Sequence, residues 1–178
     1  MRRSLLASLA LVALMAGAAH ARGIDLGVYG GTSLPLLQED ANSGTLYGIR
    51  LPLKFVPLIS VEPFYAKGKT TDKSTTVNGA SYTRSGFDQT SYGVNAMFSF
   101  GGPISFFPYA GIGTTTLTRP GLDASYSTYD FGFGIGLSVI PKFPIQVRGE
   151  VQALVDGQAS RKFATVTAGV SHSLFSMP

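Results

Sequence analysis

The sequence predicts an all-β protein, an eight-stranded antiparallel up-and-down transmembrane β-barrel that follows a cleavable signal peptide. Three observations lead to this fold class. Residues 129–139 alternate large apolar side chains with small or polar ones. The connections between predicted strands alternate between short and long. Charged residues make up 13% of the chain, whereas ordinary soluble domains carry about 25%.

Residues 129–139 read Tyr-Asp-Phe-Gly-Phe-Gly-Ile-Gly-Leu-Ser-Val. Side chains on a strand point alternately to opposite faces, so one face is continuously apolar and the other carries three glycines. A half-buried soluble sheet places polar side chains on its solvent face instead. Small residues on one face suit the inner wall of a narrow barrel whose outer wall meets lipid.

The first element is a signal peptide at residues 1–21. Arg2 and Arg3 give it a positive start, residues 5–15 are apolar, and Ala19-His20-Ala21 forms a cleavage site of the A-x-A kind. A transmembrane helix needs about 20 apolar residues, which is longer than this run. We therefore expect residues 22–178 to be exported as one barrel domain, without disulfides or a cysteine-linked lipid because the chain has no cysteine.

Eight segments of strand character follow the signal peptide, and none of this region has helical periodicity. The predicted strands are residues 23–32, 44–54, 58–67, 90–100, 105–117, 125–139, 145–154 and 161–175. Most of them approach or exceed the ~9–11 residues with which a tilted strand crosses a bilayer. Glycines and prolines separate the strands as hairpin connections.

The connections between these strands alternate in length. Residues 55–57, 101–104 and 140–144 form short connections that each contain proline. Longer connections span residues 33–43, 68–89, 118–124 and 155–160. Bacterial outer-membrane barrels have short periplasmic turns, longer outer loops and an even number of strands. The pattern predicts this topology with both termini in the periplasm.

With these features the chain resembles the small outer-membrane β-barrel family, of the OmpA and OmpX transmembrane type. The resemblance covers essentially all residues after the signal peptide and includes Pro108-Tyr109-Ala110-Gly111-Ile112-Gly113, which is similar to a strand motif common in these barrels. It implies location in the outer membrane of a Gram-negative bacterium and insertion by the barrel-assembly machinery. We expect a monomer.

The last strand departs from the family pattern. Family members usually end on an aromatic residue in phase with the lipid-facing positions, which helps the assembly machinery to recognise that strand. Here Ala164 and the positions in phase with it, up to Leu174, are predicted to face lipid, and Phe175 has the opposite parity. Either the strand bulges near its end or the assembly signal is imperfect.

The charged residues of the strands occupy positions whose side chains are predicted to point into the barrel. They are Asp25, Arg50, Glu62, Asp130, Arg148 and Glu150. An arginine that faces the hydrocarbon midplane costs about 2–4 kcal/mol, so we predict that these residues form a charge network in the lumen. The interior of an eight-stranded barrel is just filled by side chains. Arg50, Glu62, Arg148 and Glu150 form either a proton or ion path or a gate, or a structural core of salt bridges, and we favour the structural core because pairing alone offsets the cost of burial.

No catalytic, metal or cofactor site is predicted. His172 is the one histidine after the signal peptide, and Ser171 and Ser173 point away from it by strand parity. A nucleophile needs a base within hydrogen-bond reach, so this arrangement does not suit a lipid A-modifying enzyme. The chain lacks the cysteine and histidine spacing of a metal site, and its glycine repeats lie in strands rather than in phosphate-binding loops.

Nucleic acid is not an expected partner. The 14 lysines and arginines fall to 12 without Arg2 and Arg3, against 10 acidic residues, so the net charge of +4 falls to +2. The sequence contains no basic run and no interleaving of basic with aromatic residues, which nucleic-acid binding uses.

Aromatic residues are expected to form the two interfacial girdles of a membrane barrel. The periplasmic girdle is predicted to contain Phe55, Phe98, Phe100, Phe106, Phe107 and Phe143, and the outer girdle Tyr47, Tyr65, Tyr92, Tyr126 and Tyr129.

Basic residues are predicted at the outer strand ends and loops, where they either contact lipopolysaccharide phosphates or belong to a solvated surface. They are Lys67, Lys69, Lys73, Arg84, Arg119, Arg161 and Lys162. The longest connection, residues 68–89, is rich in Thr, Ser, Lys and Asp, so we expect it to be exposed or partly disordered. An external partner is expected to bind there first, because binding residues concentrate on loops.

The sequence thus favours a non-enzymatic outer-membrane barrel with a structural or interaction role, whose partners are outer-membrane lipid, lipopolysaccharide and an external molecule. A narrow channel or small-ligand conduit is the main alternative. A lipid A-modifying enzyme and a soluble periplasmic barrel of the lipocalin type remain as further hypotheses, the latter with the Phe-rich face turned inward.

Overall fold

The computed structural model describes residues 23–37, 42–56, 58–138, 145–156 and 162–176, and for residues 145–156 it describes the backbone alone. The predicted signal peptide lies outside the described residues. No helix in the described part of the chain is long and apolar enough to cross a membrane.

The described residues form twelve strands. They are β1 (Gly23–Leu37), β2 (Gly44–Arg50), β3 (Leu53–Val56), β4 (Ile59–Thr70), β5 (Lys73–Val77), β6 (Ala80–Arg84), β7 (Asp88–Phe98), β8 (Phe100–Gly101), β9 (Ile104–Arg119), β10 (Leu122–Ser138), β11 (Ile145–Asp156) and β12 (Lys162–Ser176).

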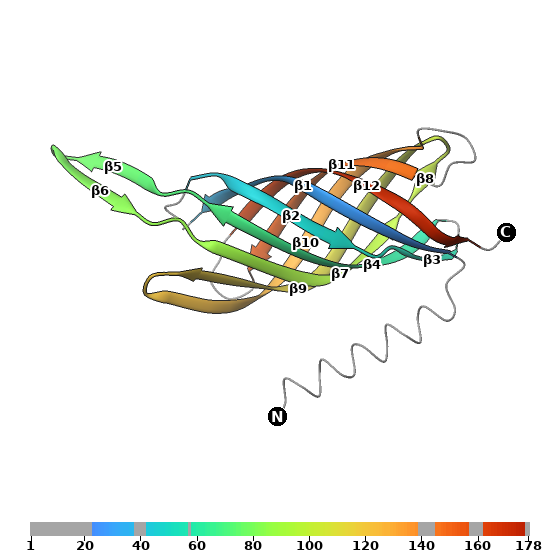
Figure 1. Cartoon of the computed structure of the whole chain (residues 1–178), viewed down its shortest axis with the longest axis horizontal. Helices are drawn as coiled ribbons and strands as arrows, with labels where there is room; N and C mark the ends of the chain where they lie inside the picture. The colour runs from blue at the N-terminus through green and yellow to red at the C-terminus, as the bar shows by residue number, and fades with distance from the viewer. Residues whose placement is uncertain (1–22, 38–41, 57, 139–144, 157–161, 177–178) are drawn as a thin grey trace, which may run out of the picture.

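Ten of these strands close into an eight-stranded antiparallel barrel (Figure 1), because β2 with β3 and β7 with β8 each form one interrupted barrel strand. The ladder runs β10–β11–β12–β1–β2–β4–β7–β9, and β9 pairs with β10 to close it. Each strand pairs with its neighbours along the chain, and β1 pairs with β12. The predicted up-and-down barrel is confirmed, and the predicted strand 44–54 is broken at Leu51 and Pro52.

The two ends of the barrel differ (Figure 1). At one end, which we call the terminal end, Gly23 of β1 pairs with Ser176 of β12. At the other, the hairpin end, the ribbon of β5 and β6 extends beyond the neighbouring strands. These two strands form a separate sheet that does not pair with the barrel in the described chain.

The barrel wall is apolar outside and polar inside. On β10, Phe131, Phe133 and Ile135 are 55%, 46% and 43% exposed, whereas Gly134 and Gly136 of the opposite face are buried. Along the wall near the terminal end, the rings of Phe98, Phe100, Phe106 and Phe133 follow one another at centroid distances of 6.3, 6.0 and 6.1 Å. The lipocalin-type alternative is therefore wrong, because it needs the Phe-rich face inside.

Two apolar clusters lie inside the barrel. The hairpin-end plug consists of Phe87, Leu117 and Phe163, against which Tyr126 packs, and the rings of Phe87 and Phe163 meet edge to face at 5.9 Å. The terminal-end plug consists of Met97, Phe107 and Tyr109. The prediction that Phe107 and Tyr126 belong to the interfacial girdles was wrong, because strand parity turns both side chains inward.

Two predicted long connections contain more strand than expected. Residues 118–124 reduce to a turn at Pro120 and Gly121, where Gly121 has φ of 78°. Within residues 68–89, the ribbon of β5 and β6 reverses at Asn78 and Gly79, with φ of 51° and 78°. Positive φ at both central residues is the type I′ geometry that joins the strands of a hairpin, and Asn-Gly is its preferred sequence.

A β-bulge near the end of β12 decides the position of Phe175. Asp25 pairs with Ser173, but the preceding Ile24 pairs with Phe175, so β12 contains one extra residue, Leu174. A one-residue insertion reverses the face of everything beyond it. Phe175 is accordingly exposed, as Leu174 is. The first of the two predicted explanations, a bulge that restores the phase of the aromatic residue, is correct.

Candidate functional site

Arg50 of β2 lies inside the lumen and spans two neighbouring strands. It is buried, and its guanidinium carbon lies 4.8 Å from the centre of the Tyr29 ring. A Cβ atom built on Gly27 of β1 would be 2.8 Å from Arg50 Cγ, and one on Gly169 of β12 would be 2.6 Å from Arg50 Nη2. Both glycines therefore make room for this one side chain.

Glu62 of β4 shares a small cavity with Arg50. The cavity has a volume of about 10 Å³ and is lined by Tyr29, Arg50, Glu62, Phe64, Asn95, Tyr109 and Thr167. About 10–15 Å³ is the least space that holds one water molecule. The described side chains around Arg50 and Glu62 are therefore closely packed and leave no open pore at this level of the lumen.

Asp130 of β10 is fully buried, at 0% exposed. It pairs in register with Gly111 of β9, and the side-chain oxygen of Asn95 lies over Gly111. Among the described residues, neither carboxylate oxygen of Asp130 has a hydrogen-bond partner. Asp130 thus lies in the wall next to Asn95, without a hydrogen bond that joins it to Arg50 and Glu62.

Asp25 lies apart from the other lumen charges. Its carboxylate forms an ion pair of 2.6 Å with the exposed Lys54 of β3 at the terminal end. Both residues line a depression of about 290 Å³ there, together with Ser60, Met97 and Phe107. Among the described side chains, Asp25 pairs with Lys54 at the barrel mouth, whereas Arg50 and Glu62 line one cavity in the lumen, and the single network stays a prediction.

Arg148 and Glu150 belong to β11, of which the backbone is described. Arg148 pairs in register with Gly136 and Gly169, and Glu150 with Gly134 and Thr167. Their side chains lie outside the described part, so their place in the lumen stays a prediction.

Three residues that contact or neighbour the lumen charges were not predicted from the sequence. Tyr29 and Asn95 both line the cavity, and their inward parity was a readable signal. Lys54 was not predictable as the partner of Asp25, because it meets β1 only through the pairing of β1 with β3.

On the outer wall, tyrosines are followed by lysines toward the hairpin end. Tyr47, Tyr65 and Tyr92 are exposed, and Tyr65 pairs directly with Tyr92. Lys67 pairs with Tyr47, and Lys69 lies two residues further toward the hairpin end on the same exposed face of β4. This order matches the aromatic belt and the charged layer beyond it at a membrane interface.

The other predicted basic residues do not join Lys67 and Lys69. Lys73 and Arg84 pair with each other across the β5–β6 ribbon. Arg119 is half-buried at the end of β9, and Lys162 is exposed at the start of β12, opposite Leu37. Arg161 lies outside the described residues.

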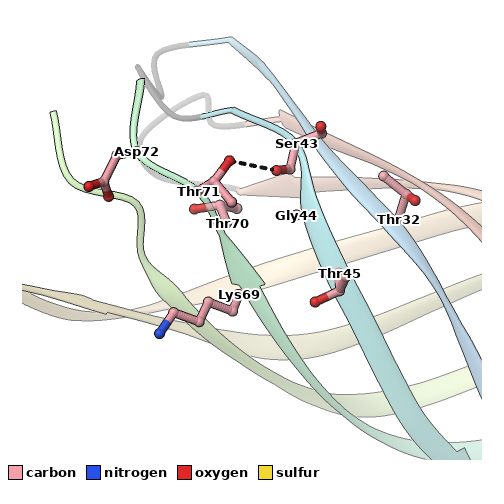
Figure 2. Close-up of a pocket in the computed structure, with 8 residues that line it drawn as sticks. All are labelled: Thr32, Ser43, Gly44, Thr45, Lys69, Thr70, Thr71 and Asp72. Atoms are coloured by element: carbon pink, nitrogen blue, oxygen red, sulfur yellow. Dashed lines mark hydrogen bonds between the residues drawn. The ribbon is translucent and has the colours of Figure 1, made fainter. Parts of the chain in front are cut away.

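A groove of about 760 Å³ lies on the outer wall at the hairpin end, beside Lys69 (Figure 2). Its lining is Thr32, Ser43, Gly44, Thr45, Lys69, Thr70, Thr71 and Asp72. The Thr71 hydroxyl donates a hydrogen bond of 3.3 Å to the Ser43 carbonyl oxygen across it (Figure 2). The groove thus presents hydroxyl groups together with one lysine and one carboxylate.

His172 and the serine before it lie on opposite faces of β12. His172 is exposed on the outer wall, whereas Ser171 is buried on the inner face. The described chain contains no group of three or more His, Asp or Glu residues that could hold a metal ion.

Comparison with known proteins agrees with this architecture. Residues 4–173 match the family described as outer membrane protein beta-barrel domain. No curated protein matches the sequence. Neisserial surface protein A has a similar structure, at 14% identity and a TM-score of 0.64, over 85% of this chain and 97% of that one.

Two further solved structures are similar at the level of the fold. The N-terminal β-barrel domain of Pseudomonas aeruginosa OprF has 12% identity and a TM-score of 0.59, over 86% of this chain and 98% of that one. The attachment invasion locus protein Ail of Yersinia pestis has 13% identity and a TM-score of 0.52, over 85% and 97%. The match to the family over nearly the whole sequence shows that this chain belongs to the outer-membrane β-barrel proteins, which places it in the bacterial outer membrane.

Proposed function

We propose that this protein is a non-enzymatic barrel that acts through its outer surface, with lipopolysaccharide and an external molecule as partners, and not through its lumen. The observation that supports this proposal is the close packing of the described side chains inside the barrel. Two apolar plugs occupy its ends, and the cavity between the lumen charges measures about 10 Å³. The described side chains thus leave little room for a solute at these levels of the lumen, which favours this proposal over the conduit alternative.

In this proposal the hairpin end faces the outside of the cell and both termini lie in the periplasm. Outer-membrane barrels place their longer loops outside, and the β5–β6 ribbon is a long projection at the hairpin end (Figure 1). The barrel-assembly machinery then meets the last strand through Phe175, which the bulge turns outward. The barrel acts as a monomer, because its ladder closes on itself and leaves no long edge.

Lys67 and Lys69 are the proposed contacts to lipopolysaccharide. They follow the tyrosine row on the outer wall, at the depth where head-group phosphates begin. The hydroxyl-lined groove beside Lys69 offers hydrogen bonds to the sugar that carries such a phosphate. Charge-assisted hydrogen bonds to phosphate are the stronger ones in proteins, so this pair should stabilise the barrel specifically in a lipopolysaccharide-containing leaflet.

Unfolding in vesicles tests this proposal. We expect lipopolysaccharide to raise the denaturant midpoint of the wild-type barrel, and Lys67→Gln/Lys69→Gln to lose most of that increase. The matched control is Lys73→Gln/Arg84→Gln, which removes the same charge from the ribbon and should keep the increase. Equal behaviour of both double variants contradicts the assignment of the contact to Lys67 and Lys69. Steady conductance or altered lipid A in overexpressing cells would contradict the non-conducting, non-enzymatic role.

A further inference from the structure

A depression at the terminal end of the barrel lies between the mouth of the lumen and the outer wall. Its volume is about 290 Å³, and residues of β1, β3, β4, β7, β8 and β9 line it. Figure 1 shows β3 and β8 at the end of the barrel that carries the C-terminus. Sites for small molecules usually have volumes of about 300–1,000 Å³, so this depression is large enough for a lipid head group but not for a whole lipid.

Asp25 and Lys54 make the polar side of this depression. They form the ion pair of 2.6 Å that joins β1 to β3. The break after β2 brings these two strands together, and Asp25 N–H donates a hydrogen bond of 3.0 Å to the Pro52 carbonyl oxygen there. The Asp25 side chain is 8% exposed and the Lys54 side chain 50%. The depression therefore has its negative charge deep in the wall and its positive charge nearer the opening.

One oxygen of the Asp25 carboxylate is left without a hydrogen bond. Lys54 engages Oδ2, whereas Oδ1 is buried and has no hydrogen-bond partner among the described residues. A buried acceptor without a partner costs free energy, and more so when it is charged. The terminal torsion of an aspartate is broad, so a small turn of the carboxylate presents Oδ1 to the depression. A donor that enters the depression gains a hydrogen bond that the described residues do not supply.

The rest of the depression is partly apolar and reaches the outer wall. Met97 and Phe107 of the terminal-end plug line it on the lumen side. Leu58 and Phe100 also line it and are 47% and 45% exposed. The Phe100 ring stacks on that of Phe106 in the phenylalanine row of the outer wall. Aromatic residues of this kind mark the level at which hydrocarbon meets the head groups, so the depression opens at head-group depth.

A phosphoethanolamine head group has chemistry complementary to this arrangement. Its ammonium donates N–H bonds, which Asp25 Oδ1 can accept, and its phosphate accepts from the ammonium of Lys54, which has three N–H groups. Its net charge is zero, so it leaves no unbalanced charge beside the neutral ion pair. A choline head group has the same charges but no N–H to donate. A glycerol head group leaves the lipid anionic and offers Asp25 no cation.

We propose that the terminal-end depression binds the phosphoethanolamine head group of a phospholipid in the leaflet on that side of the membrane. The ammonium of the lipid reaches Asp25 Oδ1, Lys54 bridges Asp25 Oδ2 and the phosphate, and the glycerol backbone lies against Leu58 and Phe100. The site goes beyond the proposed function and shares with it only one point, the assignment of the terminal end to the periplasmic leaflet.

Met97 provides the signal for a test in solution. It lines the depression and is the one methionine among the residues that the structure describes. The purified barrel, with ¹³C-labelled methionine methyl groups, is studied by NMR in uncharged detergent micelles, where binding does not depend on orientation in a membrane. Phosphatidylethanolamine is added in steps, with phosphatidylcholine and phosphatidylglycerol of the same acyl chains as comparison lipids. We expect a saturable shift of the Met97 methyl signal with phosphatidylethanolamine, and binding at least about tenfold weaker for the other two lipids.

Variants of the ion pair separate a site from general contact with lipid. Asp25→Asn and Lys54→Gln should each weaken binding by about tenfold, because hydrogen bonds between charged groups are the strong ones. Lys162→Gln removes the same charge as Lys54→Gln at the exposed hairpin end and should bind like the wild type. Asp25→Lys/Lys54→Asp keeps an ion pair with its polarity reversed and should not restore binding. Mobility of boiled and unboiled samples on SDS gels shows that each variant is a folded barrel.

Several results overturn the proposal. Equal binding of phosphatidylethanolamine and phosphatidylcholine shows that no N–H donor engages Asp25. Equal weakening by Lys54→Gln and Lys162→Gln shows attraction to net charge without a site. A Met97 shift that soluble glycerophosphoethanolamine produces with the same affinity excludes a lipid as the source of the head group, and absence of a saturable shift removes the site altogether. None of these results affects the stability test of Lys67 and Lys69 at the other end of the barrel, so the two proposals fail independently.

Discussion

Glycines of the inner wall make room for the long side chains that fill the lumen. Gly27 and Gly169 lie under Arg50, Gly111 lies under Asn95, and Gly132 lies under Tyr109. The inner face therefore combines very small residues with very large ones, which close-packed interiors require. A substitution at such a glycine acts on its partner across the wall rather than on its own strand.

Gly27→Ala and Gly30→Ala should therefore have opposite effects on stability. Both residues lie on β1, but Gly27 faces Arg50 Cγ, which would be 2.8 Å from the new Cβ, while Gly30 has its nearest atom, the Leu46 carbonyl oxygen, at 3.5 Å. Overpacking costs about 1–3 kcal/mol, whereas an unstrained Gly→Ala change gains about 0.4–1 kcal/mol.

Denaturant unfolding in phospholipid vesicles measures both changes. We expect Gly27→Ala to lower the free energy of unfolding and Gly30→Ala to raise it slightly. Similar losses at the two positions would show that Arg50 moves aside at no cost, and that the inner wall is not close-packed at this point.

The inner positions of single residues were predictable, but their partners were not. Parity alone directs Arg50, Glu62 and Asp130 inward, because the opposite face of each strand is apolar. Parity does not set the register between distant strands, so it could not separate Asp25 from the other charges or identify Lys54 as its partner. The bulge at Leu174 was likewise recognisable only as a conflict between Phe175 and the phase of its strand.

Strands and turns were predictable where a residue pattern has one structural meaning. All eight barrel strands were found, since each combines an apolar face with turn residues at its ends. The ribbon was missed because its polar composition resembles an exposed loop, although Asn78-Gly79 between two runs of Thr, Ser and Val is a hairpin signal. The turn at Pro120-Gly121 was predicted as a longer connection, residues 118–124, whereas its flanking strands continue up to the turn.

The β5–β6 ribbon should depend on the conformation of its turn independently of the barrel. Gly79→Ala places a Cβ at φ of 78°, which costs about 1–2 kcal/mol for a residue other than glycine. A two-stranded ribbon is only marginally stable, so this change should open it. Asn78→Gly is the matched control, because glycine adopts the φ of 51° at this position without strain.

Hydrogen exchange of the ribbon amides measures the result. Faster exchange in residues 73–84 of Gly79→Ala, with barrel amides and boiling-dependent mobility unchanged, is the expected outcome, and Asn78→Gly should exchange like the wild type. Simultaneous loss of protection in the barrel would mean that ribbon and barrel unfold as one unit, contrary to their separate sheets.

In the described part of the chain, two apolar plugs lie in series inside the barrel, and we expect them to close the lumen together. The hairpin-end plug and the terminal-end plug come from different parts of the wall, with Arg50 and Glu62 in the packed layer that Tyr109 also lines. We expect either plug alone to exclude water, because each consists of large apolar side chains. Opening the lumen would therefore require changes at both ends, which a single ligand at the hairpin end would not produce.

Planar-bilayer recordings test this arrangement. The wild-type barrel should give no steady current in concentrated salt. Phe87→Ala/Phe163→Ala and Met97→Ala/Phe107→Ala each remove one plug and should also stay closed, because the other plug remains. The combination of all four substitutions should conduct, provided that boiling-dependent mobility shows it to be folded. A steady wild-type current, or a current after removal of one plug, would refute the series arrangement and restore the conduit as the main function.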